Sequence, residues 1–98
     1  MAKLIWSPQS LDDIDGICRY IARDSERYAR LFGERILAMA ESIAKHPLVG
    51  AMVPEYQRQD LRERLLQNYR IVYRVRGDVV EIATIVHAAR LLPPSPPG

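Results

Sequence analysis

Three arginines on one predicted strand are the residues of this chain best suited to bind a charged group. Arg70, Arg74 and Arg76 fall at alternating positions of Y-R-I-V-Y-R-V-R, so they share one face of the strand. A guanidinium group can bind phosphate or carboxylate through two parallel hydrogen bonds. Val72 and Ile85 are expected to leave an apolar strip beside Arg70. This strip favours a binding surface over a solvated face whose arginines pair with local carboxylates.

A histidine at the end of the last predicted strand offers a second kind of chemistry. His87 could be the general base that takes a proton from a ribose 2′-hydroxyl, while Arg70 stabilises the developing phosphorane. Glu63 could complete an acid and base pair. The alternatives are a structural histidine and a salt bridge between Glu63 and an arginine, and only Lys3 and Lys45 add further amines. Because no complete catalytic set is visible, catalysis by Arg70, His87 and Glu63 is the weaker interpretation.

Three further arginines flank the same predicted sheet. Arg62 and Arg64 share a strand face by alternation, and Arg90 follows the last strand. They are either solvated or in contact with a partner, and the sequence does not choose between these roles. The candidate partner-binding residues are therefore Arg62, Arg64, Arg70, Val72, Arg74, Ile85, His87 and Arg90.

Composition places these residues in one small domain. The 98 residues are 48% hydrophobic and 27% charged, and this composition supplies enough apolar side chains for one core. A chain of this length is too short to form two cores. No apolar run reaches the roughly 18 residues of a membrane helix, and the first residues lack the apolar core of a signal peptide, so we expect a cytoplasmic protein. The single Cys18, with His46 and His87, makes no zinc-binding spacing. We expect no disulfide, metal or cofactor.

Basic charge is concentrated in the second half of the chain. Residues 57–98 hold seven Lys and Arg against four Asp and Glu, whereas residues 1–56 hold seven against eight. Twelve of the fourteen basic residues are arginine. An acidic protein segment and a nucleic-acid backbone both fit this balance, and charge alone does not separate them.

Hydrophobic periodicity predicts the elements that position these residues. The apolar run Lys3–Trp6 predicts a strand, and apolar residues at three- and four-residue steps predict a helix over 8–23, capped by Ser7, and another over 26–45. Residues 47–60 show no period and form a long loop. The three remaining predicted strands are 61–66, 69–76 and 79–86.

This pattern predicts an α+β fold in the order β-α-α-β-β-β. A two-helix hairpin packs on one face of a mainly antiparallel sheet. Residues 1–90 form the domain, and the proline-rich tail 91–98 is expected to be an extended, mobile end.

The turn between the last two strands predicts which residues share a face. Gly77 and Asp78 favour a two-residue type II′ turn, which pairs residues whose numbers add to 155, including Arg70 with Ile85. His87 then lies on Arg70's side of the sheet. Because two helices can cover only one face, the face with the arginines is expected to be open to another molecule. As a surface residue, Arg70 should tolerate replacement by alanine within about 0.5 kcal/mol of stability.

Seven short stretches carry a likeness to a known protein family. They cover about residues 3–90 and read W-S-P-Q-S-L-D-D-I at 6–14, Y-I-A-R-D-S at 20–25, A-R-L-F at 29–32, I-A-K-H-P-L-V-G at 43–50, L-R-E-R at 61–64, N-Y-R-I-V-Y-R-V at 68–75 and V-E-I-A-T-I-V-H-A-A-R at 80–90. In this order and spacing the chain resembles the RelE/ParE superfamily of toxins from bacterial type II toxin–antitoxin systems. The D-S, the Y-R-I-V-Y and the closing V-H-A-A-R resemble the ParE branch most.

The resemblance implies a toxin that inhibits DNA gyrase by binding, serves plasmid or chromosome maintenance and forms a hetero-oligomer with a neutralising ParD-like antitoxin. The antitoxin is expected to fold on the toxin as a helix beside the helix hairpin, with a possible strand at a sheet edge. In the ribonuclease branch, the arginine after the tyrosine of this strand contacts the scissile phosphate, and Arg70 matches it by motif. A RelE-like, ribosome-dependent mRNA endoribonuclease is therefore the alternative function. An interaction module without toxicity is a third.

Overall fold

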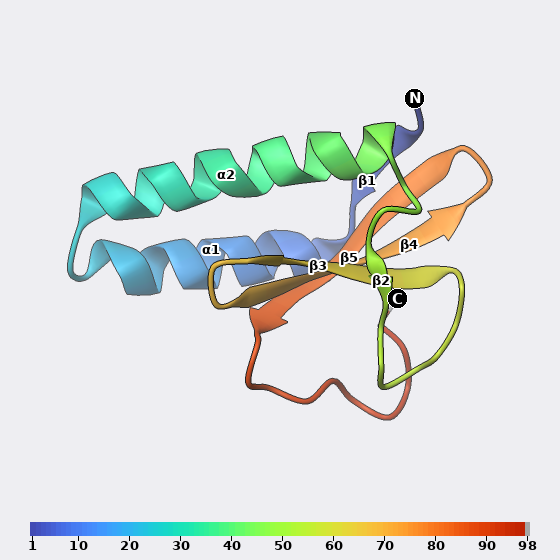
Figure 1. The fold of residues 1–98 in the computed structure, drawn as a ribbon. Coiled ribbons are helices and arrows are strands. Elements are labelled where there is room, and N and C mark those ends of the chain that lie inside the picture. The colour runs from blue at the N-terminus through green and yellow to red at the C-terminus, as the bar shows by residue number, and fades with distance from the viewer. Residues whose placement is uncertain (98) are drawn as a thin grey trace.

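Two helices lie side by side on one side of a five-stranded sheet (Figure 1). The computed structural model describes residues 1–97. The elements in chain order are β1 (Lys3–Trp6), α1 (Pro8–Ala22), α2 (Glu26–Lys45), β2 (Ala51–Met52), β3 (Leu61–Leu66), β4 (Tyr69–Arg76) and β5 (Val79–His87). The α+β fold and the helix hairpin are confirmed, and β2 is a short additional strand within the predicted loop.

Local sequence explains both helix starts. The Ser7 hydroxyl accepts a hydrogen bond from the N–H of Ser10 at 3.0 Å, and Pro8 stands in the first turn, where a missing N–H costs nothing. The Ser25 hydroxyl caps α2 by accepting from the N–H of Tyr28. Only residues 23–25 separate the helices, so α1 and α2 run antiparallel and pack together.

The sheet has the strand order β1-β5-β4-β3-β2. β1 pairs in parallel with β5, and every other pairing is antiparallel. The first strand therefore lies at one edge of the sheet and the two-residue β2 at the other.

The main core lies between the helices and the sheet. It brings apolar side chains of α2 against those of β4 and β5. Its buried members are Phe32, Ile36, Ala40, Ile43, Ile71, Tyr73, Val80, Ile82 and Ile85.

The Tyr73 hydroxyl ties the start of the long loop to this core. It donates a hydrogen bond to the carbonyl of Pro47 at 2.7 Å and accepts one from the N–H of Gly50 at 3.0 Å. A Cβ at Gly50 would lie 2.7 Å from the carbonyl oxygen of Glu63 and would also collide with Tyr73. Glycine at position 50 therefore lets the loop pass close to the sheet.

The register between β4 and β5 differs from the predicted one because of a β-bulge. Pairing near the turn is as predicted, but Val72 pairs with Thr84, and Tyr73 pairs with Ile82, so Ala83 is an extra residue on β5. Beyond the bulge every β5 side chain changes face. The expectation that Ile85 and His87 share Arg70's face was therefore wrong, because Val86 faces Arg70 and Ile85 belongs to the main core.

The face of the sheet away from the helices is also covered, contrary to expectation. Val53 from the long loop and Leu92 from the tail pack against Leu61 and Val72 in a second, smaller core. Val72 is fully buried, and Arg70 and Arg74 are each only 6% exposed. The open strip of arginine and apolar side chains is therefore absent from this face in the structure.

The proline-rich tail helps to make this second layer. Figure 1 shows it leaving β5 and curving back on the side of the sheet away from the helices. Leu92 is buried, and the Tyr56 hydroxyl donates a hydrogen bond to the carbonyl of Pro93 at 2.7 Å. Residues 91–97 are thus packed on the domain, and residue 98 of the predicted mobile end lies outside the described residues. Neither helix within residues 1–97 has the length and apolar character needed to cross a membrane.

Candidate functional site

Arg70 is the centre of a cluster of charged side chains on the face away from the helices. Its guanidinium donates to Glu63 Oε1 from Nε at 2.8 Å and from Nη2 at 2.6 Å. It donates to both carboxylate oxygens of Glu55 at 2.7 Å. A fifth hydrogen bond runs from Nη1 to the carbonyl of Arg90 at 3.3 Å. We call Arg70, Glu55 and Glu63 the Arg70 cluster.

Two strands and a loop assemble this cluster. Glu63 on β3 and Arg70 on β4 share a face because Glu63 pairs with Val72 and Arg70 pairs with Leu65. Glu55 comes from the loop between β2 and β3 and also accepts a hydrogen bond from the N–H of Leu92 at 3.0 Å. A salt bridge between Glu63 and an arginine was one alternative predicted from the sequence, and Glu63 forms this salt bridge with Arg70.

The cluster is strongly coupled electrostatically. Hydrogen bonds from Arg70 lower the pKa of Glu55 to about 2, against the opposing effect of burial. The hydrogen bonds from Glu55, and then those from Glu63, raise the pKa of Arg70. The Glu55 carboxylate is therefore ionised at neutral pH. The formal charges of the three side chains add to −1.

A shallow cleft of about 520 Å³ opens beside the cluster. Leu65, at 61% exposed, and Leu91, at 83% exposed, give it an apolar rim, and Arg90 also lines it. The cleft can accept apolar side chains of a partner next to fixed charges. Arg70 offers no free donor for a phosphate there, because a guanidinium has five N–H donors and Arg70 makes five hydrogen bonds.

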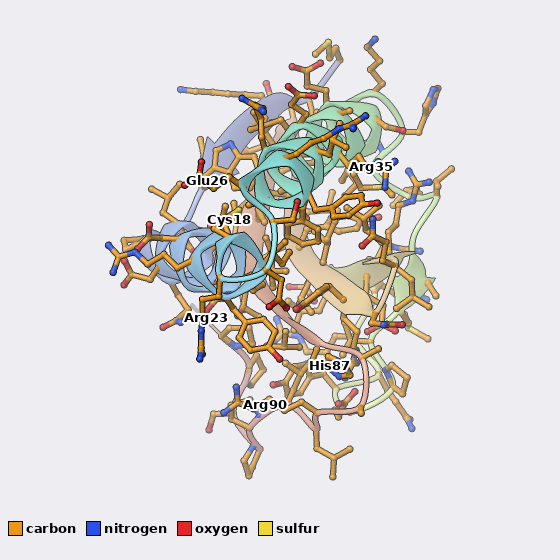
Figure 2. The ribbon with its side chains drawn as sticks, turned by 90° about the vertical axis from the view of Figure 1, so that its left-hand side faces the viewer. Cys18, Arg23, Glu26, Arg35, His87 and Arg90 are labelled. Atoms are coloured by element: carbon orange, nitrogen blue, oxygen red, sulfur yellow. The ribbon has the colours of Figure 1, made fainter. Side chains whose placement is uncertain are left out.

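His87 lies on the other side of the sheet from the Arg70 cluster. It pairs with Tyr69, and the two rings meet edge to face with centroids 5.7 Å apart. Its Nδ1 accepts a hydrogen bond from the N–H of Ala89 at 3.1 Å. Figure 2 shows His87 and Arg90 where β5 passes into the tail. The geometry does not bring His87 and Arg70 to one substrate atom.

Comparison with known proteins agrees with this fold. Residues 4–92 match the family model described as the ParE toxin of the type II toxin–antitoxin system parDE. The chain belongs to the ParE toxin family. It is therefore a ParE-like toxin of a toxin–antitoxin system.

This ParE family toxin is similar to a known toxin in sequence and to a solved structure in fold. "Toxin RelE2" of Caulobacter vibrioides (strain ATCC 19089 / CIP 103742 / CB 15) is 32% identical over 91 residues, which are 93% of this chain and 100% of that protein. A chain of the solved structure "Chromosomal ParDE TA system from P. aeruginosa" superimposes with a TM-score of 0.72 at 21% identity. That match covers 89% of this chain and 96% of the solved one, and it supports the fold.

Two other arginines that the sequence singled out make hydrogen bonds within the toxin's own fold. Arg62 and Arg64 share a face, as predicted, but this is the helix side of the sheet, where they pair with Tyr73 and Ile71. Arg62 donates to the carbonyls of Leu48, Gly50 and Gln59, and Arg64 donates to the hydroxyl of Ser42. Arg62 therefore bonds β3 to the long loop, and Arg64 bonds β3 to α2.

Three residues that matter for the toxin's site were missed by sequence reasoning. Glu55 and Tyr56 lie in the loop over 47–60, whose unusual length was the only signal that it has a role. Burial raises the pKa of Tyr56, so its hydroxyl stays a donor to the tail. Asp13 on α1 accepts hydrogen bonds from Thr84 Oγ1 and from the N–H of Ile85, next to the bulge. Within residues 1–97 no three His, Cys, Asp or Glu side chains gather to hold a metal ion.

Proposed function

We propose that this toxin inhibits DNA gyrase by binding to it, in the cytoplasm, and that a ParD-like antitoxin encoded beside it neutralises it in a hetero-oligomer. Membership of the ParE toxin family supports the gyrase target. The observation that favours binding over catalysis is the state of Arg70. Five hydrogen bonds to Glu55, Glu63 and a backbone carbonyl use all its donors, so it cannot also hold a scissile phosphate.

The helix hairpin supplies the surface for the antitoxin in this proposal. Leu11, Tyr20, Tyr28 and Leu37 are each more than half exposed along α1 and α2. A cleft of about 320 Å³ lies beside α2, between Tyr28, Phe32 and Arg35 on one side and Gln67 and Tyr69 on the other. Apolar walls with one arginine suit an acidic, amphipathic helix.

The partner-binding role of the remaining exposed candidates belongs to the same proposal. Arg90 is exposed and lines the 520 Å³ cleft together with the exposed Leu65 and Leu91. In this proposal, this second patch contacts gyrase. Arg62, Arg64, Val72 and Ile85 are occupied within the fold, so they would support such contacts only indirectly.

A supercoiling assay with purified gyrase tests the target. We expect the toxin to inhibit supercoiling and to trap cleaved, linear DNA after protein denaturation, and we expect the purified product of the neighbouring reading frame to abolish both effects. Arg90→Ala is the test variant and should weaken inhibition without altering the melting temperature. Arg19→Ala, which removes an exposed arginine of α1, is its matched control and should change neither inhibition nor the melting temperature. Unaffected gyrase would contradict the proposal.

The alternative function, an mRNA endoribonuclease, is supported by the name Toxin RelE2 of the relative at 32% identity. It predicts codon-linked cuts in mRNA when the toxin is added to translating ribosomes, with gyrase unaffected. Its catalytic residues would be Arg70, His87 and Glu63, so Arg70 would first have to leave both carboxylates. Controlled expression without antitoxin tests the third alternative, because unchanged growth would indicate an interaction module without toxicity.

A further inference from the structure

The end of the chain, residues 91–97, lies as a strap across the face of the sheet opposite the helices. Nearly every polar contact of the strap uses its main chain. The Tyr56 hydroxyl donates to the carbonyls of Pro93 and Ser95, and Arg74 donates to the carbonyl of Pro97. The N–H of Leu92 donates to Glu55.

Only one side chain of the strap is buried deeply. Leu92 is 7% exposed and packs with Val53, Leu61 and Val72, whereas its neighbour Leu91 is 83% exposed. Four of the seven strap residues are prolines, which have no N–H, so the groove beneath recognises carbonyl oxygens. The groove therefore fits an extended main chain that carries one leucine-sized apolar residue, and little in its contacts depends on the other side chains of the strap.

We propose that this groove is a peptide-binding site that the strap fills within the molecule, and that an extended apolar segment of the antitoxin replaces the strap in the complex. The contacts of the strap are the evidence for the groove, and the identity of the partner rests on the proposed function. Such an exchange is energetically accessible because the incoming segment would remake the same hydrogen bonds to Tyr56, Arg74 and Glu55. The tethered strap competes at an effective concentration on the order of millimolar, so only a partner anchored elsewhere on the toxin would displace it.

The first experiment tests the groove without the antitoxin. A fluorescent peptide of residues 88–98 is titrated into the full-length toxin, its Leu92→Ala variant and its Leu91→Ala variant. We expect Leu92→Ala to bind the peptide about tenfold more tightly than the wild type, because its own strap has lost the buried side chain. Leu91→Ala should bind like the wild type, and a peptide with the Leu92→Ala change should bind to none of the three.

This titration has outcomes that would contradict a peptide-binding groove. Equal binding to wild type and Leu92→Ala, or no binding to either, would overturn the proposal. Leu92→Val keeps most of the side chain and should give a smaller increase in peptide affinity. It therefore provides the same test if Leu92→Ala folds poorly. A concentration-dependent dimer of Leu92→Ala in place of peptide binding would mean that the groove takes the strap of a second copy, which contradicts exchange with the antitoxin.

The second experiment tests the exchange in the complex. Amide hydrogen exchange of Leu92 is compared in the free toxin and in its complex with the purified neighbouring-frame protein, with the amide of Gly50 as the control. Displacement predicts at least tenfold faster exchange at Leu92 and unchanged exchange at Gly50. An antitoxin that binds while Leu92 stays protected refutes the displacement alone, whereas a neighbouring protein that does not bind the toxin refutes the proposed function.

Discussion

Arg70 shows how strongly the surroundings of one residue decide its role. By sequence it is a strand arginine with an apolar neighbour, which is typical of a binding surface. In the structure it is a buried cation between two carboxylates from different elements. Such a cluster stabilises the fold only as a complete set, because each of its charges is costly to bury alone.

Replacing Arg70 with alanine should therefore destabilise the toxin by roughly 3 kcal/mol, well above the change expected for a surface residue. The cause is that Glu55 and Glu63 would face each other without the cation between them. Urea denaturation measures the free energy of unfolding. Arg76→Ala on the same strand is the exposed control and should stay within about 0.5 kcal/mol of the wild type.

A second substitution checks the cause of this loss. Adding Glu55→Gln to Arg70→Ala should recover part of the lost stability, because it removes one of the two uncompensated charges. Equal stability of Arg70→Ala and the wild type would show that the cluster makes no net contribution.

At the scale of the element, the bulge in β5 decides which face each of its last residues joins. Ala83 is the extra residue, and it moves Ile85 into the main core and Thr84 to the opposite face. Asp13 of α1 supports this geometry, because its Oδ2 accepts from the Thr84 hydroxyl and from the N–H of Ile85 at 2.9 Å. The helix thus contributes a polar contact to the strand as well as apolar packing.

Asp13→Ala should lower the free energy of unfolding by about 1–3 kcal/mol, since the partly buried N–H of Ile85 loses its acceptor. Asp13→Asn keeps one acceptor oxygen and should lose less. Asp12→Ala, in the exposed position next to it, is the control and should have little effect. Thermal melts of the three variants decide the matter, and identical losses for Asp12 and Asp13 would exclude a specific contact with the bulge.

At the scale of the whole molecule, the toxin is a sheet with two unequal cores. The helices cover one face, and the loop after β2 and the strap cover the other, with Glu55 bonded to both the sheet and the strap. Acid should weaken this second layer first, because Glu55 holds it through its negative charge.

The pKa of Glu55 falls from 4.5 to about 2 on folding, because Arg70 donates hydrogen bonds to the ionised carboxylate. A pKa that is lower in the folded state stabilises the fold above pH 4.5, and this contribution is lost as the pH falls from 4.5 through about 2. Urea midpoints should therefore drop across this window.

Glu55→Gln provides the matched test of this pH dependence. It should be less stable than the wild type near neutral pH but should lose less stability across the acid window, because glutamine does not titrate. Glu41→Gln, exposed on α2, should follow the wild-type curve. Parallel curves for wild type and Glu55→Gln would mean that other groups cause the acid sensitivity.

The sequence by itself determined the elements whose causes are local. Ser7 and Ser25 cap the helices through residues three positions away, apolar repeats mark the buried stripes, and Gly77 with φ of +56° makes the hairpin turn. These contacts involve neighbours in the chain, so their pattern is legible in the sequence.

Only the tertiary structure decided the register beyond the turn and the environment of Arg70. The run V-V-E-I-A-T-I-V shows no sign of the bulge at Ala83, because both of its faces carry mostly apolar side chains and either register would bury several of them. The burial of Arg70 depends on Glu55 and on the strap around Leu92, which come from fifteen residues before it and twenty-two after it. Such contacts form only when the whole chain is folded, so the sequence predicted the architecture of this toxin but not that Arg70 is buried within it.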